Sequence, residues 1–390
     1  MAIDINHARH YLRQSLQRSE SNIELMAVDE LRAHSMEILQ TYGQGLSEQE
    51  QFDLHAAKDG IINDCIGFGP LTSLLNDSSI TEIMVNNYQT IFIERCGQLH
   101  QSPVVFESED DLLRVIDRII APLGRRLDSS QPMVDARMPD GSRINAVLSP
   151  IALNGSCLTV RKFLTKQLNF SDLVFQNVLS ADAAEYLRKA VEQRRNILIA
   201  GGTGTGKTTL LNTLASAVSA HQRLVTIEDA AELQLNHQNL IALEARPANA
   251  EGNGRISIRE LLINALRMRP DRIIIGECRG VEAIDMLQAM NTGHEGSLTT
   301  LHANTARDAL QRLEVMVLMA GLDLPLTAVR QQIASAIDIV IQIHRSSNGQ
   351  RVISEISEVT GVDAEVIQLS QMFVRNNNEC KATGVLSEWL

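Results

Sequence analysis

Residues 201–208 read Gly-Gly-Thr-Gly-Thr-Gly-Lys-Thr, which matches the spacing G-x-x-x-x-G-K-[ST]. The run follows a short apolar stretch, 196–200, and precedes a stretch with helical spacing that begins at Lys207. In that setting the backbone N–H groups of a glycine-rich turn and the N-terminus of the helix bind phosphate oxygens. The motif therefore predicts a site for the phosphates of ATP rather than a plain glycine turn.

The same motif assigns two side chains to chemistry. Lys207 is expected to reach the β- and γ-phosphates, and the Thr208 hydroxyl is expected to join the shell of a Mg²⁺ ion carried by the nucleotide. ATP and Mg²⁺ are therefore the expected cofactors. The predicted nucleotide-binding residues of the loop are Gly201, Gly202, Thr203, Gly204, Thr205, Gly206, Lys207, Thr208 and Thr209.

Acidic residues follow two further apolar stretches. Residues 224–227 run into Glu228 and Asp229, and residues 272–275 run through a glycine into Glu277. Parallel strands share one carboxyl edge, so these acids are expected to lie beside the glycine-rich loop. We predict that Glu228 polarises the attacking water and that Glu277 holds the metal through water as the Walker B acid. The alternative for each is a cap or a salt bridge.

The remaining candidates are a histidine and three arginines. His302 lies at the end of another apolar run, where the residues alone favour an ordinary half-buried histidine over a phosphate sensor. Arg137 and Arg143 flank the turn Pro-Asp-Gly at 139–141, and Arg161 precedes a domain junction. Arginines in such positions are usually solvated, but phosphoryl transfer in ring motors also uses arginines supplied by another domain or subunit.

Alternating strands and helices position the loop and the acids. From about residue 171, strand-like runs at 196–200, 224–227, 272–275 and 297–301 alternate with helical stretches, which predicts a parallel sheet covered on both faces. Ser257 and Glu260 form a capping box before one of these helices. The chain is expected to close with a hairpin turned at Asn348-Gly349.

The first 170 residues have a different texture. Residues 1–60 have helical spacing without strand alternation, and 61–170 carry short β-rich runs, including 91–94, 103–106, 144–148 and 158–163, around a helix at 109–120. The predicted fold class is α/β, with an ATPase domain at 171–390, a smaller α+β domain at 61–170 and a helical extension at 1–60.

Composition excludes several classes of protein. No apolar run approaches the roughly 20 residues that a membrane-spanning helix needs, and no secretory signal is present, so we expect a cytoplasmic protein. The five cysteines are scattered singly, which argues against a zinc ribbon or a disulfide framework. A formal charge of -12 disfavours a protein whose main task is to bind nucleic acid, and no nucleic-acid partner is expected.

The set of motifs resembles the type II/type IV secretion ATPase superfamily. The resemblance rests on the loop at 201–209, Ile-Glu-Asp at 227–229, the segment 267–279 with Gly-Glu-Cys-Arg, and Thr-Gly-His-Glu-Gly-Ser-Leu-Thr-Thr-Leu-His-Ala-Asn at 292–304. Within the superfamily the chain is similar to the CpaF branch, the ATPases of Tad (Flp) pili. That similarity rests on the segments 67–71, 83–86, 134–143, 158–163 and 244–246.

The resemblance implies a RecA-like ATPase domain, with Glu228 in the Asp box, Glu277 as Walker B and His302 in the His box. It also implies that Arg137, Arg143 and Arg161 approach the nucleotide across the cleft between domains. The assembly implied is a homo-hexameric ring that docks on an inner-membrane platform protein at the cytoplasmic face. The tetracysteine insert of type II secretion and type IV pilus extension relatives is absent, and residues 1–60 and 375–390 match no motif.

Several functions remain open on sequence alone. The leading one is a motor that hydrolyses ATP to assemble a Tad/Flp-type pilus, and the second is the ATPase of a type IV system that transfers DNA or protein. A nucleotide-responsive regulator without useful hydrolysis is a third, and a small-molecule kinase is the remaining P-loop class. The cargo, the direction of work and the nucleotide occupancy of a ring cannot be read from these residues.

Overall fold

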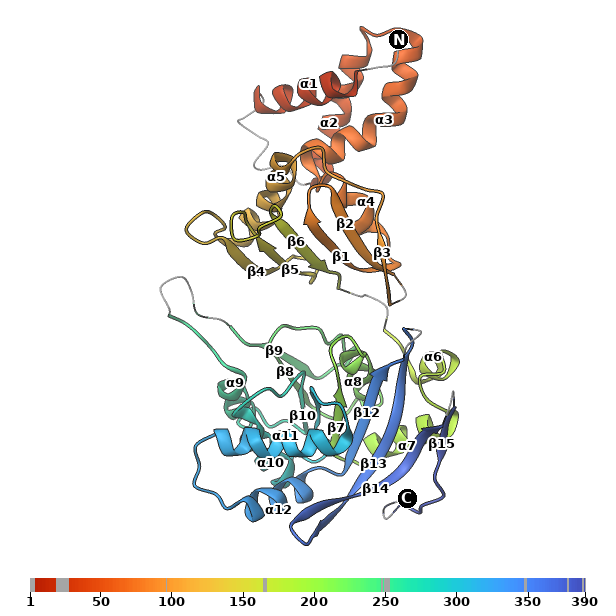
Figure 1. The fold of residues 1–390 in the computed structure, drawn as a ribbon, viewed down its shortest axis with the longest axis vertical. Helices are drawn as coiled ribbons and strands as arrows, with labels where there is room; N and C mark the ends of the chain where they lie inside the picture. Colours follow the sequence, from red (N-terminus) through yellow and green to blue (C-terminus); the bar gives the residue numbers. More distant parts are fainter. Residues whose placement is uncertain are drawn as a thin grey trace. The chain divides into compact units, whose positions relative to one another are not determined.

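The computed structural model describes residues 4–18, 28–95, 97–163, 167–246, 248, 253–346, 349–376, 379–387 and 389. The chain forms two compact units, Met1–Leu164 and Thr165–Leu390, and each is described by itself (Figure 1). Unit 1 holds the helices α1 to α5 and the strands β1 to β6, and unit 2 holds the remaining elements.

Unit 1 begins with a bundle of three helices, as the helical spacing of the sequence predicts. The helices are α1 (Ile5–Arg18), α2 (Val28–Gly43) and α3 (Glu48–Ile66). Ser47 and Glu50 form a capping box that starts α3. The core of the bundle is formed by the buried apolar side chains of Ala8, Leu12, Leu39, Leu54, Ile61 and Ile62. The apolar spacing of these helices therefore buries a small core of its own within unit 1.

A six-stranded antiparallel sheet forms the rest of unit 1, in the order β3-β2-β1-β6-β5-β4. Helix α5 packs on one face through an apolar stripe that includes Leu112, Ile116 and Ile119. The elements are α4 (Leu71–Asn76), β1 (Ile80–Asn87), β2 (Thr90–Arg95), β3 (Gln98–Gln101), α5 (Glu109–Ile120), a 3-10 turn (Ala121–Leu123), β4 (Met133–Arg137), β5 (Arg143–Val147) and β6 (Cys157–Arg161).

The turn Pro-Asp-Gly at 139–141, noted in the sequence, joins β4 and β5 into a hairpin. Gly141 has φ +90°, and a Cβ there would lie 2.9 Å from the ring of Phe163, so this position requires glycine. The predicted strand at 103–106 is wrong. Pro103 has no N–H to donate, and the Val104 N–H bonds to the Ser102 hydroxyl, so the segment is a loop. The edge strand β3, whose four residues are all exposed, precedes it instead.

Unit 2 is built on a nine-stranded sheet in the order β15-β14-β13-β12-β7-β11-β10-β8-β9. Its elements are α6 (Phe170–Phe175), α7 (Ala181–Glu192), β7 (Ile197–Gly201), α8 (Lys207–Ala215), β8 (Leu224–Glu228), β9 (Leu240–Glu244), α9 (Ile258–Ala265), β10 (Arg272–Ile275), α10 (Glu282–Asn291), β11 (Leu298–Leu301), α11 (Ala306–Met319), α12 (Leu326–Ala336), β12 (Ile339–Arg345), β13 (Arg351–Asp363), β14 (Val366–Asn376) and β15 (Glu379–Ala382).

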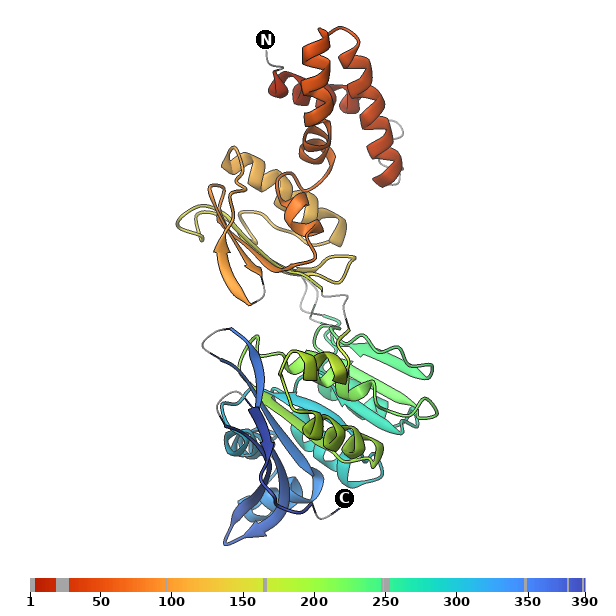
Figure 2. The same cartoon turned by 90° about the vertical axis from the view of Figure 1, so that its right-hand side faces the viewer.

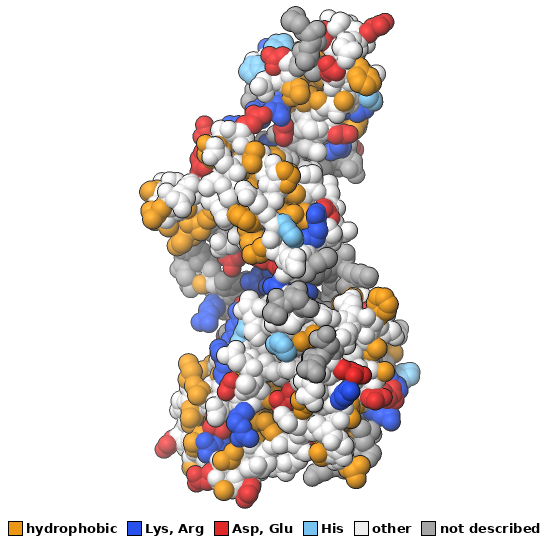
Figure 3. Space-filling view, turned by 45° about the vertical axis from the view of Figure 1, so that its right-hand side comes forward, with side chains coloured by type: hydrophobic (Ala, Val, Ile, Leu, Met, Phe, Trp, Pro, Cys, Tyr) orange, Lys and Arg blue, Asp and Glu red, His pale blue; other side chains and the backbone are white. Residues whose placement is uncertain are grey.

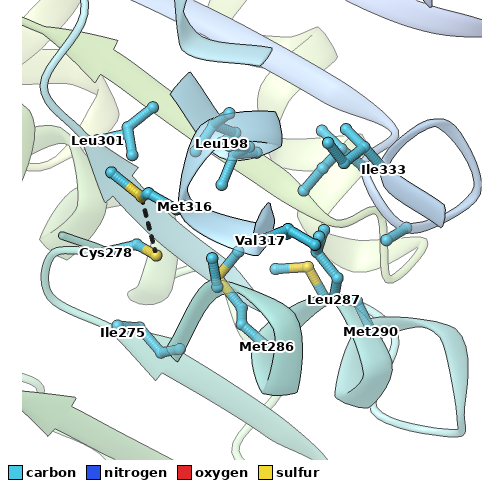
Figure 4. Close-up of a cluster of buried hydrophobic side chains, with 14 of the residues drawn as sticks. Leu198, Ile275, Cys278, Met286, Leu287, Met290, Leu301, Met316, Val317 and Ile333 are labelled. Carbon is cyan, nitrogen blue, oxygen red and sulfur yellow. Dashed lines mark hydrogen bonds between the residues drawn. The ribbon is translucent and has the colours of Figure 1, made fainter. Parts of the chain in front are cut away.

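Helices cover both faces of this sheet (Figure 2). Along β7, Ile197 and Ile199 pack with α7 and α8, whereas Leu198 and Ala200 pack with α10 to α12. Successive residues of a strand point to opposite faces, so a strand buried on both sides must be apolar throughout. Figure 4 shows the buried side chains between the sheet and helices α10 to α12. In this cluster the sulfur atoms of Cys278 and Met316 lie 4.0 Å apart.

The end of unit 2 differs from the sequence prediction. Only the strands from β12 to β9 in the sheet order, that is β12, β7, β11, β10, β8 and β9, are parallel as predicted. The strands β13, β14 and β15 are added antiparallel beyond β12. The predicted hairpin between β12 and β13 is confirmed, although Asn348 of its turn lies outside the described residues. The sheet is therefore mixed, and its last strand, β15, lies within the segment 375–390, which matches no motif.

The C-terminal segment packs back onto α7. Trp389 is the only tryptophan of the chain, and its ring centroid lies 5.2 Å from that of Tyr186. The guanidinium of Arg195 lies 5.1 Å from the same indole. Glu358 accepts hydrogen bonds from the hydroxyls of Tyr186 (2.6 Å) and Ser387 (2.7 Å). These contacts fix the C-terminal segment to the rest of unit 2.

Figure 3 shows acidic and basic side chains interspersed on the drawn face of unit 2, so the net charge of -12 is not gathered into one patch there. Among the residues that the structure describes, none of the helices combines the length and the hydropathy that a bilayer-spanning segment requires.

Candidate functional site

The glycine-rich loop connects β7 to α8 in unit 2. Gly204 and Gly206 have φ of +69° and +97°, a region that side chains with a Cβ rarely enter. A Cβ on Gly201 would lie 2.5 Å from the carbonyl oxygen of Ile343, so the strand passes too close to β12 for any other residue. These glycines allow the backbone to curl around the N-terminus of the nine-residue helix α8, which is the form of a phosphate cradle.

Lys207 is the first residue of α8, and only 8% of it is exposed. Its Nζ donates to the carbonyl oxygens of Gly201 (3.0 Å) and Gly202 (2.8 Å). The same atom lies 3.5 Å from Nδ1 of His302. The ammonium therefore lies inside the curve of the loop, where phosphate oxygens would meet it.

His302 follows β11 and contacts Glu277, which follows β10. The Nε2 atom of His302 lies 2.8 Å from Oε1 of Glu277. Burial lowers the pKa of His302, and the nearby charge of Lys207 lowers it further. A neutral imidazole that accepts from Lys207 at Nδ1 must carry its proton on Nε2, the atom that lies beside Glu277. The structure thus brings together three residues that the sequence predicted separately.

Arg279 contacts the other oxygen of Glu277. Its Nη2 donates to Oε2 of Glu277 at 2.8 Å, and its Nη1 donates to Oδ2 of Asp229 at 3.3 Å. These two acids follow the neighbouring parallel strands β10 and β8. A continuous row of polar contacts therefore runs along the carboxyl edge, from Lys207 through His302, Glu277 and Arg279 to Asp229.

Glu228, the last residue of β8, is buried with 3% exposed. Burial raises its pKa to about 7, although the N–H groups of Glu232 and Leu233 donate to its Oε2 at 2.7 and 3.0 Å and oppose that shift. A Cβ on Gly276 would lie 2.9 Å from the side chain of Glu228, so the two strand ends lie in close contact. Glu228 both anchors the following loop and keeps a carboxyl that titrates near neutral pH.

Sequence reasoning missed three residues of this edge. Glu232 lies 3.3 Å from the Thr208 hydroxyl, and Glu282 accepts through one oxygen from the N–H groups of Arg279 (2.7 Å) and Gly280 (2.9 Å). Arg351 of β13 donates to the carbonyl of Gly204 at 3.2 Å. The first two follow predicted strand ends within a few residues, which was the available signal, whereas no local pattern connects Arg351 to the loop.

The predicted arginines lie in unit 1. Arg137 and Arg143 are directly opposite on β4 and β5, and Arg143 is directly opposite Arg161 on β6. Directly opposed residues of antiparallel strands point to the same face, so the three form a row across adjacent strands. The face is the one opposite α5, because their neighbours Ile144 and Val160 belong to the core. We name these three residues the arginine row.

The arginine row continues into acids on β1 and β2. Arg161 is directly opposite Glu82, which is directly opposite Glu94. Burial raises the pKa of Glu82, and the charge of Glu94 raises it further, while Arg161 opposes the shift. Arg137 also lies 5.6 Å from the ring centroid of Phe163. Like charges directly opposite one another destabilise a sheet.

Most of the chain is similar in sequence to known proteins. The family model "Type II/IV secretion system protein" matches residues 65–385. A protein of Mycobacterium tuberculosis whose name assigns it provisionally to conjugal transfer is 37% identical over 306 residues, which cover 77% of this chain and 86% of that one. The conjugal transfer protein TrbB of Rhizobium radiobacter is 33% identical and covers 77% and 90%. The type IV secretion system protein VirB11 of Brucella suis is 32% identical and covers 70% and 84%.

Solved structures show the fold. The Legionella pneumophila ATPase DotB aligns with a TM-score of 0.54 at 21% identity over 76% of this chain and 80% of that one. The pilus retraction motor PilT, solved with ADP, aligns with a TM-score of 0.54 at 20% identity over 75% and 83%. The predicted α/β class, a RecA-like ATPase domain preceded by a smaller α+β domain, is confirmed by this likeness.

Proposed function

The chain belongs to the type II/IV secretion system protein family, and from this premise we propose that it hydrolyses ATP to ADP and phosphate to drive a secretion or pilus-assembly machine. The observation that carries the proposal is the row of contacts that links Lys207 to Glu277 through His302. The lysine of a glycine-rich phosphate loop is linked here to a carboxylate that follows another strand of the same sheet. Such a pair is suited to bind the phosphates of a nucleotide together with the metal ion that they carry.

The residues present fit Mg²⁺. The ion prefers oxygen ligands and keeps several of its waters, and the edge offers the Thr208 hydroxyl next to Glu232, with Glu277 nearby for a water-mediated contact. When bound, the ion neutralises phosphate charge and orients the nucleotide. Thr208 and Glu277 are the residues proposed to hold it.

The remaining residues divide the work of hydrolysis. Lys207 would exchange its two carbonyl acceptors for phosphate oxygens, and the backbone of the loop would hold the other phosphates. Glu228 is proposed to polarise the attacking water, because a carboxyl with a pKa of about 7 is substantially ionised at neutral pH and still accepts a proton well. His302, whose Nε2 lies 2.8 Å from one oxygen of Glu277, is proposed to orient that carboxylate by this contact.

The arginine row is proposed to supply the positive charge that hydrolysis requires, from the same chain or from a neighbouring copy. Cations delivered to the transferring phosphoryl group are worth large factors in turnover. The like charges of Arg137, Arg143 and Arg161 in register support this role. A homo-hexameric ring is the assembly proposed, with an inner-membrane platform protein as its partner at the cytoplasmic face of the membrane.

Two machines are candidates for the work. The relatives TrbB and VirB11 carry names from conjugal transfer and type IV secretion, which favours a type IV system. The motifs of unit 1 and the bundle of helices α1, α2 and α3 favour a Tad/Flp pilus of the CpaF type. Deleting the gene in its source organism distinguishes them, because loss of surface fibres supports the pilus and loss of DNA or protein transfer supports the secretion system.

Steady-state ATPase activity across a range of protein concentrations, with mass determination in solution, tests the motor. Turnover that needs Mg²⁺ and rises as a ring assembles is the expected result. Full assembly with tight ATP binding and no turnover would instead identify a nucleotide-responsive regulator. Assembly must be measured alongside activity, because sites completed by a second subunit are silent in the monomer.

A further inference from the structure

The proposed hydrolysis gives no task to Arg279, a member of the polar row at the carboxyl edge. Arg279 bridges two acids, with Nη2 at 2.8 Å from Glu277 and Nη1 at 3.3 Å from Asp229. One of these acids, Glu277, is the proposed metal-directed carboxylate. Whatever cation occupies this edge must therefore share Glu277 with the guanidinium.

The three side chains of the bridge differ in their exposure to solvent. Glu277 is 18% exposed, whereas Arg279 and Asp229 are 53% and 52% exposed. Ion pairs between half-exposed groups contribute little, because water competes for both partners. The guanidinium can therefore leave Asp229, and then Glu277, without opening the core of unit 2.

The backbone beneath Arg279 is held independently of its side chain. Glu282 is buried and accepts from the N–H groups of Arg279 and Gly280, so the loop keeps its course when the guanidinium moves. The opposite oxygen of Glu277 remains with His302 at 2.8 Å. The movable part is thus the side chain of Arg279 alone.

We propose that Arg279 is a positioning residue that neutralises Glu277 and Asp229 until Mg²⁺–ATP arrives, and so competes with the metal for the site. The inference rests on the proposed function, since it assumes that Mg²⁺ binds near Glu277. Its consequence is that Arg279 sets the Mg²⁺ concentration at which the site fills. It also orients Glu277, so removing it should make the metal easier to bind and the reaction slower.

Calorimetric titration with the slowly hydrolysed analogue ATPγS, repeated at a series of Mg²⁺ concentrations, measures this. In Arg279→Gln, the Mg²⁺ concentration for half-maximal binding is expected to fall roughly tenfold, which is the effect of removing one unit charge from the surroundings of a divalent ion in a largely hydrated site. The turnover of the same variant at saturating Mg²⁺ is expected to fall.

Arg279→Lys keeps the positive charge but loses the guanidinium whose two Nη atoms bond to Glu277 and Asp229. The Mg²⁺ concentration that this variant requires should therefore stay close to that of the wild type, while its turnover falls. Arg259→Gln is the matched control, because Arg259 of α9 forms a comparable 2.7 Å pair with Asp285 of α10 and, within the described part of the chain, forms no ion pair with Glu277 or Asp229. It should change neither quantity.

An unchanged or higher Mg²⁺ requirement in Arg279→Gln overturns the proposal. The same holds if Arg279→Lys shifts the requirement as far as Arg279→Gln does, since charge would then not be the cause. A wild type that binds ATPγS equally with and without Mg²⁺, or not at all, refutes the proposed function instead, so the two failures are distinct.

Discussion

Nε2 of His302 lies 2.8 Å from Oε1 of Glu277, and Nδ1 of the same ring lies 3.5 Å from Nζ of Lys207. The histidine therefore connects the lysine proposed to bind phosphate to the acid proposed to hold the metal. The imidazole of His302 lies at the edge of the sheet where the neighbouring strands β7, β11 and β10 end.

His302→Ala should lower turnover about tenfold to a hundredfold, a typical cost of losing one polar contact in a preorganised site. The affinity for ATP should change little, because the loop and Lys207 remain. Steady-state kinetics with a separate binding titration separates the two quantities. His221→Ala, at an exposed turn before β8, is the control. Equal losses in both variants would contradict a role for His302.

Lys207→Ala should abolish tight ATP binding and reduce turnover by at least about a hundredfold, because no other ammonium replaces it inside the loop. Calorimetric titration with ATP measures the binding. Lys189→Ala removes a surface lysine of α7 and should behave as the wild type. A Lys207→Ala protein that binds ATP normally would show that the loop is not the nucleotide site.

Glu228→Gln should stabilise the protein at high pH. Burial raises the pKa of Glu228 to about 7 from its ordinary value of 4.5, so between these pH values the folded state holds a proton that the unfolded state has already lost. Stability contributed by the protonated form is therefore present below about pH 4.5 and is lost as pH rises through 7. At pH 8 the cost is about 3 kcal/mol.

Gln keeps an oxygen for the N–H groups of Glu232 and Leu233 but cannot ionise. The variant should therefore exceed the wild type in stability at pH 8, and the difference should shrink as the pH falls below about 5. Urea unfolding at several pH values measures this. A difference that does not depend on pH would place the titration elsewhere, and unchanged turnover would exclude Glu228 as the residue that polarises water.

Arg143→Gln removes the central charge of the arginine row. Turnover should fall by at least about a hundredfold if the row stabilises the transferring phosphoryl group. Thermal unfolding of the variant, measured alongside, separates a loss of turnover from a loss of the folded protein. Arg95→Gln breaks the pair with Asp77 on the same sheet and serves as the control. Normal turnover in Arg143→Gln would exclude the row from hydrolysis.

Glu282→Ala should destabilise the protein by about 1–3 kcal/mol, since it leaves two N–H groups of the loop after β10 without their acceptor. Glu282→Gln keeps the accepting oxygen and should cost much less. Circular dichroism during urea unfolding compares the two. Equal stability of both variants would show that the loop does not depend on this carboxyl.

Local patterns predicted the parts of the site that local forces determine. The loop at 201–208, the capping box of Ser257 and Glu260 and the turn at Gly141 each depend on a few neighbouring residues, and each lies where the sequence predicts. The strand ends at Glu228 and Glu277 were predictable because parallel strands share one carboxyl edge.

Contacts set by register or by distant segments were not predictable in this way. The arginine row depends on how β4, β5 and β6 align, which a shift of one residue would destroy. Arg279 bridges Glu277 and Asp229 only because β10 and β8 are neighbours in the sheet. The expected strand at 103–106 failed because Pro103 and the Ser102 hydroxyl favour a loop over pairing.

The position of Trp389 gives this protein a built-in optical probe. The only indole of the chain lies against Tyr186 and Arg195 in unit 2, and unit 1 contains none. Its emission should therefore report the melting of unit 2 alone. Comparing that signal with a whole-chain measurement would show whether the two units unfold together or one after the other, without any added label.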